Sequence, residues 1–472
     1  MLRAMTHPQL PDILAHLDRD AEGARARLID WLRIPSISAQ PAHAADCLRA
    51  AEWVRARLEA IGFRAETRPT AGHPVVLAHH PGTVPGAPRL LFYGHYDVQP
   101  ADPLELWTSP PFEPVIEHGP HGPRVRARGA VDDKGQTMMW LEALAAWHRV
   151  AGGPPCPVTV LVEGEEEVGS PSLDAFLAAN RAELGADVAV ISDTGMWDVD
   201  TPAITTRLRG LVYTQIDLRA AARDLHSGIY GGAALNPLNL LARILGGLHD
   251  AAGRVQIPGF YEGVAELPAA QQAEWAGLGF DEGAFLGGIG LSVPVGEQGR
   301  GGLERQWARP TADINGIWGG YTGEGSKTVI PAEAHAKLSC RLVPGQDPAR
   351  VLEGIRRFVA ERLPADAQAE VRLLGSASPG IEVAADSPFV RAARAALAEE
   401  YGRPAVLIGC GGSIPVVESF QRLLGVDSLL AGFGLAGDQV HSPNEKFELT
   451  CLHKGARSHA RMLAAFAAAA GR

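Results

Sequence analysis

The sequence lacks the features by which several large classes of protein are recognised. No run of about 18 consecutive apolar residues occurs in the 472-residue chain, so no transmembrane helix is predicted. The amino-terminal segment MLRAMTHPQLPDILAHLDRD interrupts each apolar run with proline or charge, so no secretory signal peptide is expected. Excess positive charge is absent as well. The net charge is −11 at pH 7, which argues against nucleic acid as the main partner.

Cysteine is also scarce. The five cysteines are Cys47, Cys156, Cys340, Cys410 and Cys451. They are scattered and form no CxxC pair, so the sequence suggests neither a disulfide framework nor a thiolate zinc site. A reducing compartment fits this usage best, and we expect the protein to be cytoplasmic.

Apolar residues are plentiful at 46%, which is enough for a substantial core and for two or three domains. In the first 200 residues, helix-like and strand-like segments alternate. Helices are predicted around residues 51–63 and over Gly135–Val150, and apolar strands within Arg89–Val98, Pro157–Glu167 and Asp187–Gly195. This alternation predicts a largely parallel sheet with helices on both faces.

The pattern changes near residue 207. The segment Leu211–Ala220 alternates apolar and polar residues, as expected for an antiparallel strand with one buried face. Helices are predicted over Asn236–Ala251 and Asp347–Leu363, and a strand over Lys337–Pro344. The glycine-rich stretch Gly277–Gly302 is predicted to be an irregular loop. This middle block therefore indicates a second, α+β domain inserted into the first.

Polar residues follow the predicted strands of the first domain at the ends where sites form in α/β sheets. His95 and Asp97 would share one face of a strand, so the histidine could bind a metal while the aspartate orients its ring. A surface histidine with an aspartate neighbour explains the pair equally simply. Asp193 follows the third strand, where a turn-forming aspartate is the plain alternative.

Other carboxylates and a histidine add to this set. Asp132 and Asp133 precede a helix, where aspartate is a common N-cap but can also bridge two cations. The run Glu165–Glu167 is either a solvated turn or a group that cations neutralise. His441 lies in a polar loop and needs no special explanation by itself. Imidazole and carboxylate ligands together suit zinc, manganese or cobalt, and two such ions about 3.5–4 Å apart form a common hydrolase site.

Nine stretches of the sequence, in order, resemble one metallopeptidase family, which includes the carnosine dipeptidases, aminoacylase, acetylornithine deacetylase and succinyl-diaminopimelate desuccinylase. They read GHYDVQP, RGAVDDKG, EGEEEVGS, ISDT, DLHSGIYGG, GSKTVIP, RLVPGQ, GGSIPV and HSPNEKF. The sequences of these motifs are most similar to those of the dipeptidase branch. The resemblance implies hydrolysis of the amide bond of dipeptides by a metal-bridged hydroxide.

The resemblance also implies the ligands of two divalent metal ions per chain, with zinc as the first expectation and manganese or cobalt as alternatives. His95 and Asp193 would hold one ion, and Glu167 and His441 the other. Asp132 would bridge them, and its peptide bond to the next residue would be cis.

Further roles follow from the same resemblance. Glu166 would be the general base, and Asp97 the partner of the metal-binding histidine. His226 would stabilise the oxyanion and, in relatives, reaches across a dimer; an ordinary loop histidine is the alternative. We therefore expect a homodimer with small peptides as substrates.

Three residues would contact the substrate. Arg341 has the geometry to clamp a carboxylate, although a solvated arginine at a strand end is the alternative. Thr328 and Ser413 match family positions that contact substrate, or else serve in a turn or cap. The sequence departs from dipeptidase relatives at Cys410, where they often have glutamate, and in the loop Gly375–Gly380, where they often have histidine. These departures concern substrate preference.

The predicted fold is α/β, with a mixed sheet and helices on both faces plus a smaller α+β domain. Residues 1–207 and 384–472 would form the catalytic domain, and residues 208–383 a lid and dimerisation domain. Two alternatives remain open: an N-acyl-amino-acid deacylase or desuccinylase of the same fold, and a catalytically inactive binding protein.

Overall fold

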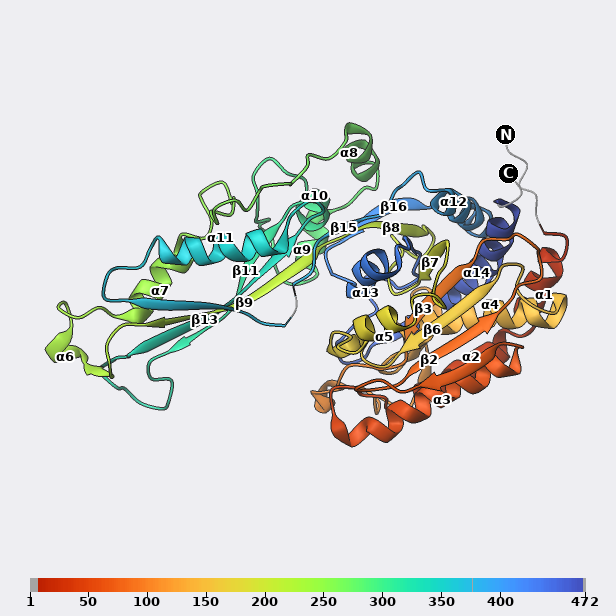
Figure 1. Ribbon diagram of the computed structural model, residues 1–472, viewed down its shortest axis with the longest axis horizontal. Helices are drawn as coiled ribbons and strands as arrows, with labels where there is room; N and C mark the ends of the chain where they lie inside the picture. The colour runs from red at the N-terminus through yellow and green to blue at the C-terminus, as the bar shows by residue number, and fades with distance from the viewer. Residues whose placement is uncertain (1–6, 376, 470–472) are drawn as a thin grey trace. The chain divides into compact units, whose positions relative to one another are not determined.

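The computed structural model describes residues 7–375 and 377–469 (Figure 1). The chain divides into two compact units. Unit 1 comprises Met1–Thr206, Val383–Ile408 and Pro415–Arg472, and unit 2 comprises Arg207–Glu382 and Gly409–Ile414. In the described ranges, no helix combines the length and the apolar character that crossing a membrane requires.

β15 (Ile381–Glu382) and β16 (Val406–Cys410) both pair with β8, in a sheet whose other strands follow the order β1-β2-β6-β3-β7-β17-β8 and build unit 1. These strands are β1 (Arg64–Arg68), β2 (Val75–His80), β3 (Leu90–His95), β6 (Val158–Glu163), β7 (Val188–Ile191), β8 (Ala203–Leu208) and β17 (Ser428–Leu430). The sheet is parallel in its middle, from β6 through β3 and β7 to β17, and antiparallel on both sides of it. A mixed sheet is therefore confirmed. It is less parallel than the first 200 residues suggested, because β1 and β2 form a hairpin with a short connection.

Helices cover both faces of this sheet. Phe92 and Tyr93 are neighbours in β3 and so point to opposite faces. The Phe92 ring lies 5.4 Å from Trp140 in α4 (Lys134–Ala151), and the Tyr93 ring lies 5.6 Å from Phe420. The predicted helix Gly135–Val150 is thus confirmed as α4.

The helix α4 is buried over most of its length because other helices of unit 1 surround it. These helices are α1 (Leu10–Arg19), α2 (Ala21–Leu32) and α14 (Leu449–Ala469). The remaining helices of unit 1 are α3 (Ala44–Ala60), α5 (Leu173–Ala179), α12 (Pro388–Tyr401) and α13 (Pro415–Ser419). A small sheet of β4 (Val115–Gly119), β5 (Gly122–Arg126) and β18 (Lys446–Glu448) completes it.

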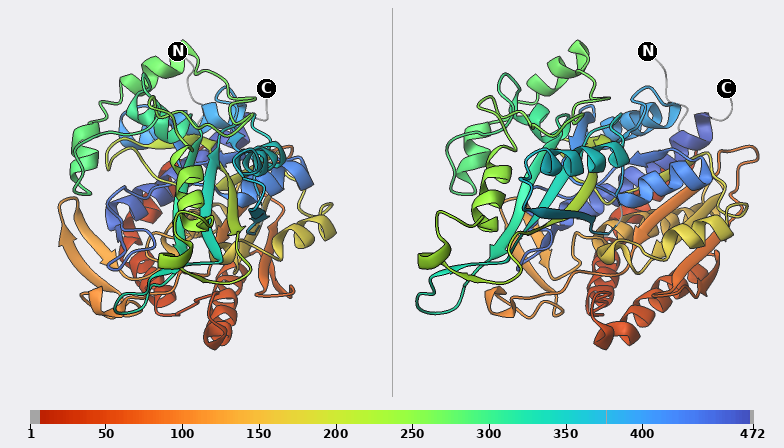
Figure 2. Two further views of the ribbon diagram at one scale, coloured as in Figure 1. Left: turned by 90° about the vertical axis from the view of Figure 1, so that its left-hand side faces the viewer. Right: turned by 60° about the vertical axis from the view of Figure 1, so that its left-hand side comes forward.

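Unit 2 contains an antiparallel sheet in the order β11-β13-β9-β14. Its strands are β9 (Gly210–Arg219), β11 (Thr311–Gly319), β13 (Glu333–Leu342) and β14 (Gln368–Leu373). Burial alternates along β9 and β13, as predicted for half-buried strands. Figure 2 shows α7 (Pro237–Gly246) and α11 (Pro348–Ala360) packed along these strands. The sheet therefore has one covered face and one open face.

The other elements of unit 2 are short. They are β10 (Leu225–His226), α6 (Ser227–Tyr230), α8 (Ala269–Ala276), α9 (Glu282–Gly287), α10 (Gly302–Trp307) and β12 (Val329–Ile330). The prediction of an irregular loop over Gly277–Gly302 is wrong where α9 lies. This helix forms because the Asp281 side chain caps it by accepting a hydrogen bond from the Ala284 N–H at 2.9 Å.

Candidate metal centre

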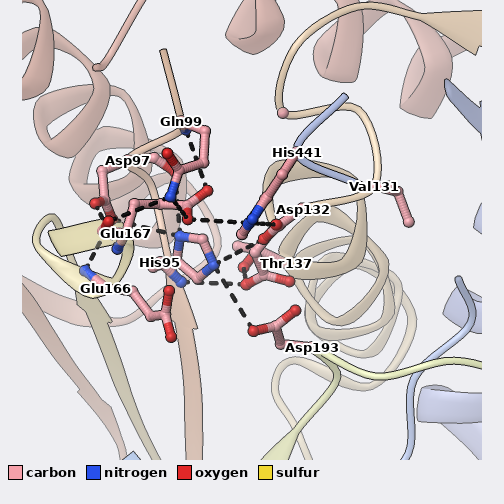
Figure 3. A network of polar contacts seen from close by, with 12 residues as sticks. His95, Asp97, Gln99, Val131, Asp132, Thr137, Glu166, Glu167, Asp193 and His441 are labelled. Carbon is pink, nitrogen blue, oxygen red and sulfur yellow. Dashed lines mark hydrogen bonds and ion pairs between the residues drawn. The ribbon is translucent and has the colours of Figure 1, made fainter. Parts of the chain in front are cut away.

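Three parallel strands of unit 1 bring candidate ligands to one edge of the sheet. His95 is the last residue of β3, which lies between β6 and β7. Glu167 lies in the turn Glu166–Val168, shortly after β6, and Asp193 follows β7. The carboxyl ends of adjacent parallel strands meet, so these three side chains converge (Figure 3).

Asp132 stands at the centre of the cluster, just before α4. Its Oδ1 lies 3.2 Å from His95 Nε2, and its Oδ2 lies 2.9 Å from His441 Nε2. Asp193 Oδ2 is 3.9 Å from His95 Nε2, and Glu167 Oε2 is 3.2 Å from His441 Nε2. The five residues thus form two groups of three potential ligands that share Asp132.

The spacing of these atoms suits a divalent metal ion. Two ligand atoms of a tetrahedral zinc ion, each about 2.0–2.1 Å from it, lie about 3.3 Å apart. The distances in the cluster, 2.9 to 3.9 Å, bracket this value. In addition, His95 Nε2 is buried and has no hydrogen-bond partner among the described residues. A cation between the groups would use this nitrogen.

Burial, together with charge repulsion, raises the pKa of carboxyl groups in and beside the cluster. Burial raises the pKa of Asp193 well above its usual range, and the negative charges of Asp132 and Asp133 raise it further. Burial also raises the pKa of Glu166, to about 7, with contributions from Glu167 and Asp132. The buried carboxylates of this cluster can all be ionised at once only if positive charge lies close to them.

Asp97 contacts His95 on the side of the ring away from the other ligands. His95 Nδ1 lies 3.3 Å from the Asp97 carboxylate and 3.1 Å from the Asp97 carbonyl oxygen. A proton on Nδ1 leaves Nε2 free to bind a cation. The Asp97 carboxylate also accepts hydrogen bonds from the backbone N–H groups of Glu166, at 3.3 Å, and Glu167, at 3.1 Å. One residue therefore orients both the histidine and the acidic turn.

Glu445 holds the bridging residue and was missed in the sequence. Its fully buried carboxylate accepts backbone N–H bonds from Gly129, Val131 and Asp132, at 2.9, 2.9 and 3.1 Å, and pairs with Arg128 Nη1 at 2.9 Å. These contacts fix the backbone that presents the Asp132 carboxylate. The peptide bond from Asp132 to Asp133 is cis, which confirms that prediction.

The remaining predicted residues lie in unit 2, in two pairs. Arg341 Nη1 donates a hydrogen bond to Ser413 Oγ at 3.0 Å. Elsewhere, His226 pairs with Val329 in a short two-stranded sheet. The backbone N–H of Ser227 donates a hydrogen bond to the carbonyl oxygen of Thr328 at 3.0 Å. The structure thus brings Arg341 to Ser413 and His226 to Thr328.

The two departures from relatives have different outcomes. Cys410 Sγ accepts a hydrogen bond from the Gly412 N–H at 3.3 Å, and neither group of potential metal ligands includes it. The loop Gly375–Gly380 contains Ser376, which lies outside the described residues.

Comparison with known proteins agrees with the site. The sequence matches peptidase family M20/M25/M40 over residues 91–465. It is 30% identical to the Cys-Gly metallodipeptidase dug1 of Schizosaccharomyces pombe over 454 residues, which are 93% of this chain and 94% of that protein. The structure of the di-peptidase Dug1p from Saccharomyces cerevisiae has a TM-score of 0.82 at 27% identity, with 98% of this chain and 99% of that one covered.

A second structural relative differs in its described activity. The metallo-carboxypeptidase Sso-CP2 from Sulfolobus solfataricus has a TM-score of 0.82 at 31% identity, with 94% of this chain and 99% of that one covered. Fold and site together define a metal-dependent peptidase. The chain belongs to peptidase family M20/M25/M40, which confirms the resemblance drawn from the motifs.

Proposed function

We propose that this chain is a dipeptidase that needs two divalent cations, with zinc as the expected ion and manganese or cobalt as alternatives. The observation that carries the proposal is the Asp132 carboxylate, whose two oxygens face two separate groups of ligands. His95 and Asp193 would complete one cation site, and Glu167 and His441 the other. When bound, such ions activate water and polarise the scissile carbonyl.

Glu166 is proposed as the general base. Its side chain is mostly buried, and its pKa, raised by burial to about 7, suits an exchange of protons near neutral pH. Figure 3 shows its carboxylate on the same side of His95 as Asp193, away from His441. Glu166 would take a proton from the attacking water and pass it to the leaving amine.

His226 is proposed to stabilise the oxyanion of a partner subunit. Its Nδ1 accepts a hydrogen bond from the Gly228 N–H at 3.0 Å, which leaves Nε2 as the donor of a neutral ring. His226 and Arg341 lie towards opposite ends of β13, and the strand from Glu333 to Arg341 alone spans about 27 Å. A dipeptide is only about 7 Å long. Both residues can therefore serve one substrate only if two chains contribute.

The edge strand β11 supports the proposed dimer. Within the described residues, β13 is its one partner strand, and it exposes Ile314, Ile317 and Trp318. An exposed apolar edge of this kind is a place where a second sheet can add. We propose that unit 2 serves as the lid and dimerisation domain, and unit 1 as the catalytic domain.

Mixed dimers test the shared site. His226→Ala and Glu166→Ala should each lose most activity, because each removes a proposed catalytic group. Mixed dimers of the two variants should regain up to about half of the wild-type activity, because one of the two sites in each mixed dimer receives both residues. Activity that stays at the level of the single variants in dimers shown to be mixed would contradict the shared site.

A substrate panel tests the activity itself. Unblocked dipeptides, tripeptides and N-acetyl amino acids would be compared with zinc-loaded enzyme. We expect the highest kcat/KM for dipeptides. The second candidate, a carboxypeptidase, is favoured by the similarity to Sso-CP2 and would cleave tripeptides as well as dipeptides. Release of acetate with intact dipeptides would instead indicate the deacylase.

We also propose a cytoplasmic location. The five cysteines, all of them described residues, form no disulfide, and four of them are buried. Burial raises the pKa of Cys47 and of Cys451 to about 12, which keeps these thiols protonated and unreactive. A cytoplasmic location suits a chain with this usage.

A further inference from the structure

Arg209 of unit 2 differs from two neighbouring arginines because it has no ion-pair partner among the described residues. A cavity of about 540 Å³ in unit 2 is lined by Arg209, Arg305 and Arg309 and by the carboxylates of Glu282, Glu297 and Asp313. Arg305 pairs with Glu282, and Arg309 forms a two-pronged pair with Glu297 at 2.6 and 2.9 Å. Arg209 forms no ion pair with any described carboxylate. A largely buried guanidinium in this state is costly unless an anion joins it.

Arg209 belongs to the same local structure as Arg341. Ser413 Oγ accepts a hydrogen bond from Arg341 Nη1 at 3.0 Å and donates one to the carbonyl oxygen of Arg209. Arg209 Nε in turn donates to the carbonyl oxygen of Gly411 at 2.9 Å. The segment from Gly411 to Ser413 therefore ties the two arginines together.

The two guanidinium groups also share a face of the sheet. Arg341 in β13 stands opposite Leu211 in β9, so their side chains lie on the same, open face. Arg209 precedes Leu211 by two residues. Side chains two positions apart in an extended chain lie on the same face, which places Arg209 on the open face as well. Arg341 likewise forms no ion pair among the described residues.

The charge of Arg341 also acts on Arg209. Burial and, next, the positive charge of Arg341 lower the pKa of Arg209 to about 10, while Cys410 and Asp313 oppose this shift. An anion between the two guanidinium groups would remove the repulsion. Among the described residues, the Arg209 side chain donates one hydrogen bond, from Nε, and the Arg341 side chain donates one, from Nη1. A guanidinium group has five N–H donors, so both groups can donate further hydrogen bonds.

We propose that Arg209 and Arg341 together bind the carboxyl-terminal carboxylate of the substrate. The inference rests on the proposed function for the choice of substrate, and it adds a second arginine to the one that the motifs indicated. A carboxylate has two oxygens and accepts hydrogen bonds from two guanidinium groups at once. The site would select peptides with a free carboxyl terminus over those with an amide there.

Direct binding tests this without turnover. Zinc-loaded Glu166→Gln enzyme would be titrated with glycyl-leucine and glycyl-leucinamide by calorimetry, alone and with Arg209→Met added. Loss of a hydrogen bond between charged groups should raise the Kd for glycyl-leucine by about 10–100-fold. The Kd for the amide should change by less than about twofold, because its neutral end makes no such bond.

Matched variants separate anion binding from a structural role. Arg305→Met removes the same charge from the same cavity, but from a residue already paired with Glu282, and should leave both Kd values unchanged. Arg209→Lys keeps a positive charge and should keep part of the preference for the free carboxylate. Equal weakening of both ligands by Arg209→Met, or no weakening at all, would overturn the proposal.

The outcome is distinguishable from failure of the proposed function. If intact enzyme does not cleave dipeptides but cleaves N-acetyl-leucine, the same titration uses N-acetyl-leucine and its amide, which differ by the same carboxylate. A selective loss in Arg209→Met then supports the arginine pair although the dipeptidase proposal has failed.

Discussion

The clusters of charge in the two units are opposite in sign. In unit 1, three carboxylates and two histidines form the cluster at the edge of the sheet, and burial with mutual repulsion raises the pKa of Asp193 and of the neighbouring Glu166. In unit 2, Arg209 and Arg341 lie together with no carboxylate paired to either among the described residues. We propose that the first cluster binds cations and the second an anion. In both proposals, the unbalanced charge of the cluster indicates the sign of its ligand.

The clusters also differ in how firmly their members are held. Asp97 and Glu445 fix the backbone around Glu166, Glu167 and Asp132 through hydrogen bonds from several N–H groups. The arginine pair depends on two side-chain contacts with the segment Gly411–Ser413. We therefore expect changes in unit 1 to abolish chemistry and changes in unit 2 to alter substrate preference.

The largest effect is expected from Glu166→Gln. It removes the proposed base while leaving the ligands in place, so kcat should fall by about 10²–10⁴-fold with two zinc ions still bound. Metal analysis and steady-state kinetics measure both. Glu165→Gln is the control within the same acidic run, because Glu165 accepts N–H bonds from His73 and Ser172 instead. Equal losses in both variants would remove the special role of Glu166.

A smaller effect is expected from Glu445→Gln. Loosening the backbone that presents Asp132 should weaken zinc binding by about 10–100-fold, as measured by competition with a chromogenic chelator. Glu400→Gln provides the control. Glu400 is another mostly buried carboxylate paired with arginines, Arg457 and Arg461, but it does not contact the cluster. Both variants should unfold at lower temperature, so zinc affinity that falls equally in both would indicate a general loss of stability.

The smallest effect is expected from Arg341→Met. Removing one carboxylate contact should raise KM for a dipeptide by about tenfold, with little change in kcat and little change for the dipeptide amide. Arg372→Met is the control, because Arg372 pairs with Asp217 in the same sheet. A similar rise in KM for peptide and amide would show that unit 2 does not read the carboxylate.

The sequence alone predicts those site residues that lie at or just after the end of a strand. The ends of β3, β6 and β7 carry His95, Glu167 and Asp193, and the rule that adjacent parallel strands end at one edge places these residues together. The bridging role of Asp132 came from resemblance, because an N-cap explains an aspartate before a helix equally well.

Other features depend on contacts between distant segments. Glu445 looks like an ordinary loop residue, and its four donors lie more than 300 residues earlier in the chain. That Arg209 forms no ion pair among the described residues is known only from the structure, which shows the carboxylate partners of Arg305 and Arg309. The helix α9 was missed because glycines in Gly277–Gly302 hide any apolar periodicity, although Asp281 is a suitable N-cap.

The most direct test of the central claim is the cation dependence of dipeptide cleavage. Enzyme stripped with a chelator would be titrated with zinc while bound metal and hydrolysis of glycyl-leucine are followed together. The shared Asp132 predicts that activity returns in full only near two zinc ions per chain. Cleavage by fully stripped enzyme, or full activity with saturation at one ion per chain, would contradict the account.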